Sequence, residues 1–209
     1  MNWTSLYFKS DALKVLILGT GEVATRRANK FLSHGAIVKL VGNSISDSLK
    51  DLGATLYSVD QIDDLVDWCD LVVIASGDRD LSNYVCEISK DKLINRADFP
   101  DEGNIIVPTS FEIGDIEISI FTNGKSPLMA RQLRKKIQSI ITEEDILEIE
   151  LQDYSRSILK EYVPNQKDRR KYLYYIFENE DIRSLIRLHD IDGAKKLIHD
   201  MIMRDFNDS

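Results

Sequence analysis

The sequence predicts an α/β fold in which a doubly wound parallel sheet is followed by a small β element and an α-helical C-terminal domain. Three observations support this. Strand-like and helix-like stretches alternate over the first hundred residues, a short alternating β pattern follows, and from Glu143 onward only helical spacing is present. We therefore expect three parts, at residues 1–110, 111–145 and 146–209.

The first strand, turn and helix carry the most informative motif. Val15–Leu18 is a continuous apolar run of the kind that a parallel strand buried on both faces needs. The pattern G-x-G-x-x-A follows at once: Gly19 allows a tight turn, Gly21 leaves room for a phosphate, and Ala24 lets the next helix pack closely on the strand. The N-terminus of that helix would face a pyrophosphate. This predicts dinucleotide binding, with a purely structural glycine turn as the alternative.

The second strand is expected at Ala36–Val41. A standard NAD site places an acidic residue near the end of this strand to hold the adenosine ribose. Here Asn43 and Ser44 occupy that place and offer hydrogen bonds without the charge. The site therefore looks permissive for NAD or NADP.

The remaining βα units follow in order, and the spacing predicts helices at Ser46–Leu52, Gln61–Trp68 and Asp80–Lys90 and strands at Ala54–Val59, Asp70–Ser76 and Leu93–Asp98. Ser76 ends a strongly apolar strand, at the edge where open parallel sheets present ligand-binding loops. Asn95 and Asp98 lie at the end of the next strand, where Asn95 is expected to contact the substrate and the carboxylate of Asp98 could reach a ligand beside the nicotinamide. The alternative is that Asp98 only starts the turn toward Pro100.

The pattern changes after Phe99. Two antiparallel strands are expected at Ile105–Pro108 and Ile116–Phe121, joined through Glu112–Asp115, in an element where subunits could meet. Asn123-Gly124 then predicts a turn.

A strong helix is expected at Leu128–Ile141, with Ser126 as N-cap and Pro127 in the first turn. Lys125 precedes this helix, and Arg131, Arg134 and Lys135 share one side of it. With the helix N-terminus they could bind a polycarboxylate through charge-assisted hydrogen bonds. A capped helix with an ordinary basic face is the alternative.

Bulk properties exclude several function classes. A net charge of −8 argues against nucleic acid or an anionic membrane as the main partner. The apolar runs are too short to span a bilayer, and the N-terminus lacks a signal-peptide pattern. The two cysteines, Cys69 and Cys86, are expected to be reduced in a cytoplasmic protein. The three histidines are scattered, so we expect no metal site built on them.

Four motifs, taken together and in this order, resemble the precorrin-2 dehydrogenase family, which includes the N-terminal module of siroheme synthase. They are Gly19-Thr20-Gly21-Glu22-Val23-Ala24 with Arg26 and Ala28, Asn95-x-x-Asp98, Asn104 to Phe111, and Asn123 to Arg131. The resemblance covers roughly residues 3–145. Thr20 departs from the family's usual glycine, and Arg96 stands where an apolar residue is usual.

The resemblance implies a homodimeric Rossmann enzyme that uses NAD to oxidise precorrin-2, a tetrapyrrole, to sirohydrochlorin. By position, Gly19, Gly21, Glu22 and Val23 fall on the pyrophosphate loop, and Asn43 and Ser44 near the adenosine. Asp98 falls on the catalytic aspartate, as a general base or as a group that orients the macrocycle. Ser126 falls on the serine of the family's G-x-S-P motif, beside the substrate's carboxylates together with Lys125 and Arg131.

Two other functions stay open at this stage. One is a dinucleotide-sensing module without catalysis, although such modules normally keep the acidic residue that is absent after the second strand. The other is a chelatase that inserts ferrous iron into the tetrapyrrole, alone or beside the dehydrogenase activity.

Overall fold

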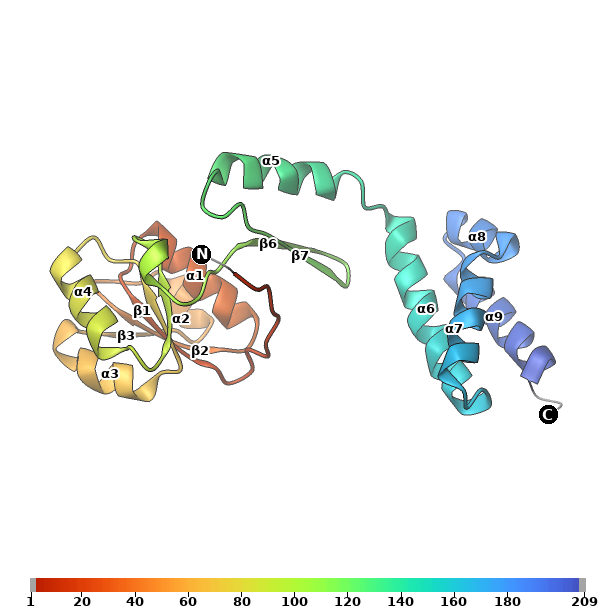
Figure 1. Ribbon diagram of the computed structural model, residues 1–209, viewed down its shortest axis with the longest axis horizontal. Helices are drawn as coiled ribbons and strands as arrows, with labels where there is room; N and C mark the ends of the chain where they lie inside the picture. Colours follow the sequence, from red (N-terminus) through yellow and green to blue (C-terminus); the bar gives the residue numbers. More distant parts are fainter. Residues whose placement is uncertain (1–2, 207–209) are drawn as a thin grey trace. The chain divides into compact units, whose positions relative to one another are not determined.

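The computed structural model describes residues 3–206 and divides into two compact units, Met1–Val107 and Pro108–Ser209. The first two and last three residues, which belong to the expected parts 1–110 and 146–209, lie outside the described residues. Figure 1 shows the parallel sheet of the first unit and the hairpin and helices of the second.

The first unit is the predicted doubly wound sheet. Its five parallel strands run in the order β3-β2-β1-β4-β5. The chain moves outward through β1, β2 and β3, then returns to the other side of β1 for β4 and β5, so the winding direction reverses between β1 and β4. The strands are β1 (Lys14–Leu18), β2 (Ile37–Val41), β3 (Thr55–Tyr57), β4 (Leu71–Ile74) and β5 (Leu93–Arg96).

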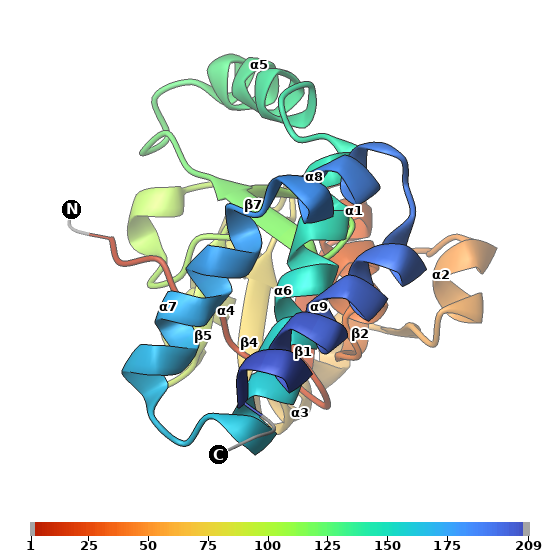
Figure 2. The same ribbon diagram turned by 90° about the vertical axis from the view of Figure 1, so that its right-hand side faces the viewer.

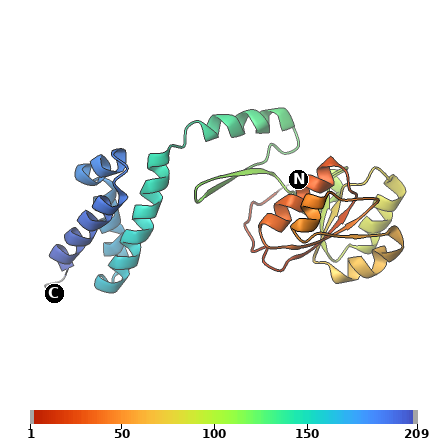
Figure 3. The same cartoon turned by 180° about the vertical axis from the view of Figure 1, so that it is seen from behind.

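Helices cover both faces of this sheet, and each face has its own apolar core. They are α1 (Glu22–Ser33), α2 (Asp47–Asp51), α3 (Ile62–Trp68) and α4 (Arg79–Ile88), with 3₁₀ turns at Val59–Gln61 and Pro100–Glu102. Val15 and Ile17 point toward α1 and α2, which lie together in the view from behind (Figure 3), whereas Leu16 and Leu18 point toward α3 and α4. Side chains that alternate between two buried faces explain why β1 is apolar throughout.

The prediction of a strand at Ile105–Pro108 is wrong. This segment is extended but belongs to the first unit, where Ile105 and Val107 pack against the α1 face of the sheet. The N–H of Ile105 donates to the carbonyl of Ile94 at 3.1 Å, so the segment is fastened to the end of β5. Pro108 cannot donate a ladder hydrogen bond, and the hairpin strand begins only after it.

The second unit begins with an antiparallel hairpin of β6 (Thr109–Ile113) and β7 (Ile116–Ile120). The predicted turn at Asn123-Gly124 is confirmed, since both residues have positive φ. Helix α5 (Pro127–Gln138) follows and packs along the hairpin (Figure 1).

Four further helices complete the second unit, as the helical spacing predicted: α6 (Glu143–Tyr162), α7 (Gln166–Phe177), α8 (Glu180–Arg187) and α9 (Ile191–Phe206). They lie side by side (Figure 2) around a core that includes Leu151, Leu159 and Ile198. The break after Tyr162 falls at Pro164, and Asn165 caps α7 by accepting a hydrogen bond from the N–H of Lys167. Among residues 3–206, every helix is too short or too polar to cross a bilayer.

Candidate functional site

The glycine turn lies where the ends of β1, β2 and β4 meet. The N–H of Gly19 donates to the carbonyl of Val41 at 2.8 Å, and the N–H of Ala75 donates to the carbonyl of Leu18 at 2.9 Å. Gly19 has φ +112°, and a Cβ there would overlap the backbone carbonyl of Ala75. Only glycine can take this position, and it places the turn at the point where the winding direction reverses.

Gly21 has a different reason to be glycine. It is the N-cap of α1, and a Cβ added there would meet no atom within 4 Å. The space above its backbone is therefore open, and the first N–H groups of α1 receive no side-chain cap from it. Glu22 and Val23 follow on the exposed first turn of the helix. This cradle of free amides with room above it fits a pyrophosphate.

The end of β2 lies beside this turn. Gly42 packs against the side chain of Thr20, because a Cβ at residue 42 would lie 2.6 Å from Cγ2 of Thr20. Asn43 and Ser44 come next and are exposed. Both residues therefore have the accessibility that a role in holding the adenosine ribose requires.

Ser76, at the end of β4, has a structural partner in its own loop. Its Oγ accepts a hydrogen bond from the N–H of Asp78 at 3.0 Å, and the carboxylate of Asp78 caps α4 by accepting from the N–H of Leu81. The half-buried Ser76 side chain thus shapes the loop that borders the glycine turn.

Asn95 is enclosed within the first unit. Its residue exposure is 3%, and its Nδ2 donates to the carbonyl of Ile105 at 3.1 Å. The Oδ1 atom is buried and has no hydrogen-bond partner among the described residues. We therefore assign Asn95 the role of fastening residues 104–107 to the end of β5, instead of the direct substrate contact expected from the sequence.

Asp98 lies just beyond β5 and forms a two-point ion pair with Arg96. Arg96 Nε donates to Oδ1 of Asp98 at 2.9 Å, and Nη2 donates to Oδ2 at 2.7 Å. The side chain of Arg96 is 1% exposed and that of Asp98 19%. β1 and β5 flank β4, so the glycine turn and Asp98 belong to strand ends on the order of 10 Å apart.

This ion pair sets the charge of the site. Burial by itself would raise the pKa of Asp98, but the hydrogen bonds from Arg96 and from the N–H groups of Asp98 and Phe99 outweigh it and hold that pKa below its ordinary value. The hydrogen bond to Asp98 in turn raises the pKa of the Arg96 guanidinium. Asp98 is therefore an anion at neutral pH, with one part of its carboxylate open to solvent.

The second unit carries the proline-started helix. Ser126 Oγ accepts from the N–H of Met129 at 3.1 Å, which confirms the predicted N-cap. Lys125 and Arg131 are exposed beside it. Arg134 does not join them in a shared anion site, because its guanidinium stacks over the Phe111 ring of β6 at 5.4 Å.

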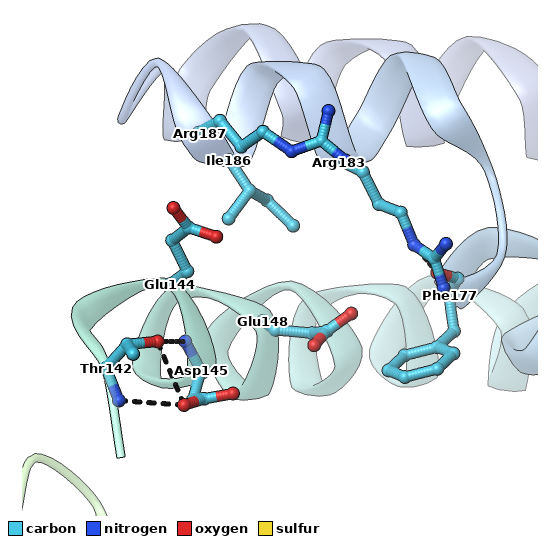
Figure 4. Close-up of a pocket in the computed structure, with 8 residues that line it drawn as sticks. All are labelled: Thr142, Glu144, Asp145, Glu148, Phe177, Arg183, Ile186 and Arg187. Carbon is cyan, nitrogen blue, oxygen red and sulfur yellow. Dashed lines mark hydrogen bonds between the residues drawn. The ribbon is translucent and has the colours of Figure 1, made fainter. Parts of the chain in front are cut away.

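A polar cavity of about 240 Å³ lies within the helical part of the second unit (Figure 4). Two of its lining side chains have structural partners: Asp145 forms a capping box with Thr142, and Arg183 pairs with Glu180, outside the lining, at 3.1 Å. Burial raises the pKa of Glu148 on its wall. Among residues 3–206, no cluster of three His, Cys, Asp or Glu side chains is placed to hold a metal ion.

Comparison with known proteins places the chain in a family. Residues 6–109 match a family model described as "Putative NAD(P)-binding". A "Putative precorrin-2 dehydrogenase" of Methanocaldococcus jannaschii is 31% identical over 191 residues, covering 85% of this chain and 91% of that protein. This chain belongs to the precorrin-2 dehydrogenase family.

Two further precorrin-2 dehydrogenases extend this result. One from Methanosarcina barkeri is 30% identical over 87% of this chain and 85% of its own length. A solved structure titled "SirC, precorrin-2 dehydrogenase" has the same fold, with a TM-score of 0.77, 21% identity and coverage of 97% of this chain and 100% of its own.

Two features of this precorrin-2 dehydrogenase family member were not anticipated. One is that Arg96 is buried and bound to Asp98; the signal available for it was a charged residue at the end of a strand, two positions before Asp98. Glu102 completes the arrangement, because its Oε2 forms an ion pair with Arg96 Nη1 at 2.9 Å. The other is Gly42: its lack of a side chain leaves room for Thr20, which explains how a threonine fits within the glycine turn.

Proposed function

We propose that this chain oxidises precorrin-2 to sirohydrochlorin with a nicotinamide dinucleotide as hydride acceptor. One observation carries the proposal: a chain of this family places an open phosphate cradle at Gly21 and an ionised carboxylate at Asp98 along one edge of one sheet. A macrocycle held over the end of β4 would lie between them.

A bound dinucleotide would supply the hydride acceptor for a saturated carbon of the macrocycle, and a proton would leave a neighbouring position for solvent. Loss of a hydride makes the macrocycle electron-poor, and the fixed anion of Asp98 stabilises that positive charge. Asp98 is less suited to accept the proton, because a general base works best when its pKa lies near the working pH. We therefore assign Asp98 an electrostatic and orienting role.

The cofactor preference follows from the end of β2. Asn43 and Ser44 are exposed there, and neither carries a charge that would repel a 2′-phosphate. We expect both NAD and NADP to support turnover, with kcat/KM values within about tenfold of each other, a difference of about 1.4 kcal/mol. A preference of a thousandfold would contradict this assignment.

The substrate's peripheral carboxylates have candidate partners in the second unit. Lys125, Ser126 and Arg131 surround an N-terminal helix end, where backbone N–H groups and positive charges favour anions. We propose that they bind those carboxylates. An Arg131→Gln variant should raise the KM for precorrin-2 without changing dinucleotide affinity, and an unchanged KM would remove Arg131 from this role.

We further propose a cytoplasmic homodimer formed through residues 111–145. Large apolar side chains are exposed on this region: Leu128 is 65% and Met129 49% exposed. Both cysteines are free thiols, as in a reducing compartment. Light scattering of the purified protein and of Leu128→Glu should give the mass of a dimer and of a smaller species respectively; a monomeric parent protein would contradict the assembly.

An anaerobic assay with precorrin-2 tests the activity itself. NADH formation and sirohydrochlorin absorbance should rise together, and Asp98→Asn should lower kcat by about 10²–10³-fold while dinucleotide affinity stays unchanged. The absence of NADH formation in the parent protein would overturn the proposal. A parallel assay with Fe²⁺ and sirohydrochlorin would report any chelatase activity separately.

A further inference from the structure

We propose that Arg96 is a positioning residue of this enzyme, which fixes the Asp98 carboxylate in one orientation and supplies the charge that keeps it an anion during turnover. The inference rests on the proposed function of Asp98. It concerns a residue that departs from the apolar side chain usual for the family, so it addresses how this particular chain builds its site.

The geometry of the pair supports positioning over simple charge pairing. Two parallel N–H···O hydrogen bonds, from Nε to Oδ1 and from Nη2 to Oδ2, hold both carboxylate oxygens in the plane of the guanidinium. A lysine ammonium is a point charge and cannot impose that plane. Rotation of Asp98 about its side-chain bonds would break at least one of the two bonds.

The guanidinium is itself held in place. Its third nitrogen, Nη1, donates to Asn83 Oδ1 at 3.3 Å and forms an ion pair with Glu102 Oε2 at 2.9 Å. The centre of the guanidinium lies 5.4 Å from the centroid of the Phe99 ring. At 1% side-chain exposure, Arg96 has no freedom to follow a moving partner. The two residues therefore differ: Arg96 is enclosed, and Asp98 alone reaches solvent.

The loop after Asp98 closes over this cation. A Cβ at Gly103 would lie 2.7 Å from the carbonyl oxygen of Ile94 and 3.0 Å from the N atom of Arg96, so the loop backbone approaches β5 as closely as glycine allows. Glu102, next to it, is thereby brought onto the guanidinium. The arrangement encloses the back of the ion pair and leaves its carboxylate side accessible.

The second role of Arg96 is to keep the Asp98 carboxylate ionised. Burial of Asp98 favours the neutral acid, and the hydrogen bonds from Arg96 reverse that preference. The other ionisable groups around the pair are Glu102 on the 3₁₀ turn and a set on α4 and just after it, namely Arg79, Cys86, Glu87 and Lys90. The guanidinium of Arg79 stacks on Phe99. Among the described residues, only Arg96 forms an ion pair with Asp98.

The test compares Arg96→Met with Arg96→Lys in the full-length protein. Arg96→Met removes charge and orientation: kcat should fall about 10²-fold, and the acidic limb of the kcat/KM–pH profile should move to higher pH because Asp98 protonates more readily. Arg96→Lys keeps the charge but loses the two-point geometry. Its acidic limb should stay close to that of the parent, while kcat falls about tenfold.

Arg79→Met is the matched control. It deletes an exposed arginine that faces the same Phe99 ring at the same 5.4 Å, and it should leave the pH profile and kcat unchanged. Dinucleotide affinity and thermal unfolding, measured on every variant, separate loss of fold from loss of positioning. If Arg96→Met does not fold, Arg96→Lys decides by the split between an unchanged pH limb and a lowered kcat.

The outcomes distinguish this inference from the proposed function. An inactive parent protein would overturn the proposed function, and an Asp98→Asn variant as active as the parent would overturn the role of Asp98 on which this inference rests. An impaired Asp98→Asn beside an Arg96→Lys of parental kcat would leave the function standing and overturn the positioning role. A folded Arg96→Met variant whose acidic limb is not shifted would overturn the role of Arg96 in keeping Asp98 ionised.

Discussion

The side chain of Thr20 fills the space that a side chain at position 42 would need, and Gly42 leaves that space free. A Cβ on Gly42 would lie 2.6 Å from Cγ2 and 3.0 Å from Oγ1 of Thr20, so the threonine in the glycine turn is possible only because the residue after β2 has no side chain. Thr20 is β-branched and has few rotamers into which it could retreat. The two positions, 22 residues apart in sequence, therefore form one steric unit beside the dinucleotide cradle.

The added methyl group of Gly42→Ala should clash with the side chain of Thr20, and Thr20→Gly should remove that clash. Overpacking of this kind costs about 1–3 kcal/mol, and we expect the free energy of unfolding to fall by that amount and dinucleotide binding to weaken. The double variant Thr20→Gly/Gly42→Ala should recover most of both losses. Denaturant titration and calorimetric binding of the four proteins give the coupling energy; purely additive effects would contradict the contact.

Gly19 and Gly21 should respond to alanine in opposite ways. Gly19→Ala places a Cβ on the Ala75 carbonyl at φ +112° and should destabilise the first unit by at least about 1–3 kcal/mol. Gly21→Ala meets no protein atom within 4 Å, so its stability should match that of the parent, while its dinucleotide affinity falls because the methyl group enters the phosphate space. Thermal unfolding with and without NAD separates the two. A stable Gly19→Ala, or a Gly21→Ala with parental affinity, would contradict the respective role.

Ser126→Ala tests the cap of α5. Loss of the hydrogen bond that Oγ accepts from the N–H of Met129 should cost about 1 kcal/mol of unfolding free energy. Ser126→Asp should retain the cap, since aspartate accepts the same bond. Ser139→Ala, at the other end of the helix, is the matched control and should cost less. Equal losses at both ends would mean that the cap contributes nothing of its own.

The two cysteines should differ in reactivity toward a maleimide. Burial raises the pKa of the Cys69 thiol to about 11, so that thiol stays protonated and enclosed at neutral pH. Cys86 is partly exposed. Mass spectrometry of the native protein should show one modified thiol, on Cys86, and two after unfolding. Rapid native labelling of Cys69 would contradict its burial.

Much of the first unit could be predicted from local sequence, because strands buried on both faces are written as unbroken apolar runs. Val15–Leu18 and Leu71–Ile74 are such runs, and both are strands. Ile105–Pro108 looks equally apolar but packs as a single extended segment on the outer part of the same core. Hydrophobicity reports that a segment is buried, and it does not report which partner supplies its hydrogen bonds.

The chemistry of the site was predicted less completely. Arg96 and Asp98 are two positions apart, so an extended chain puts both side chains on one face. Whether that face is open or enclosed depends on Phe99 and Glu102, which fold back only because the chain turns at Pro100. Ser126, whose cap is set by its nearest neighbours, was predicted correctly for the opposite reason: every atom that decides it lies within four residues.

The bend of the β6–β7 hairpin has a consequence for how this protein can be divided. Gly114 has φ +53°, and a Cβ there would lie 2.7 Å from Cγ2 of Ile146, so the hairpin tip is seated on the first turns of α6. A truncation that ended before α6 would remove Ile146 and leave the hairpin tip without its packing partner. The hairpin and the helices should therefore be expressed together as one fragment. To produce the two units separately, the chain should be cut before Pro108.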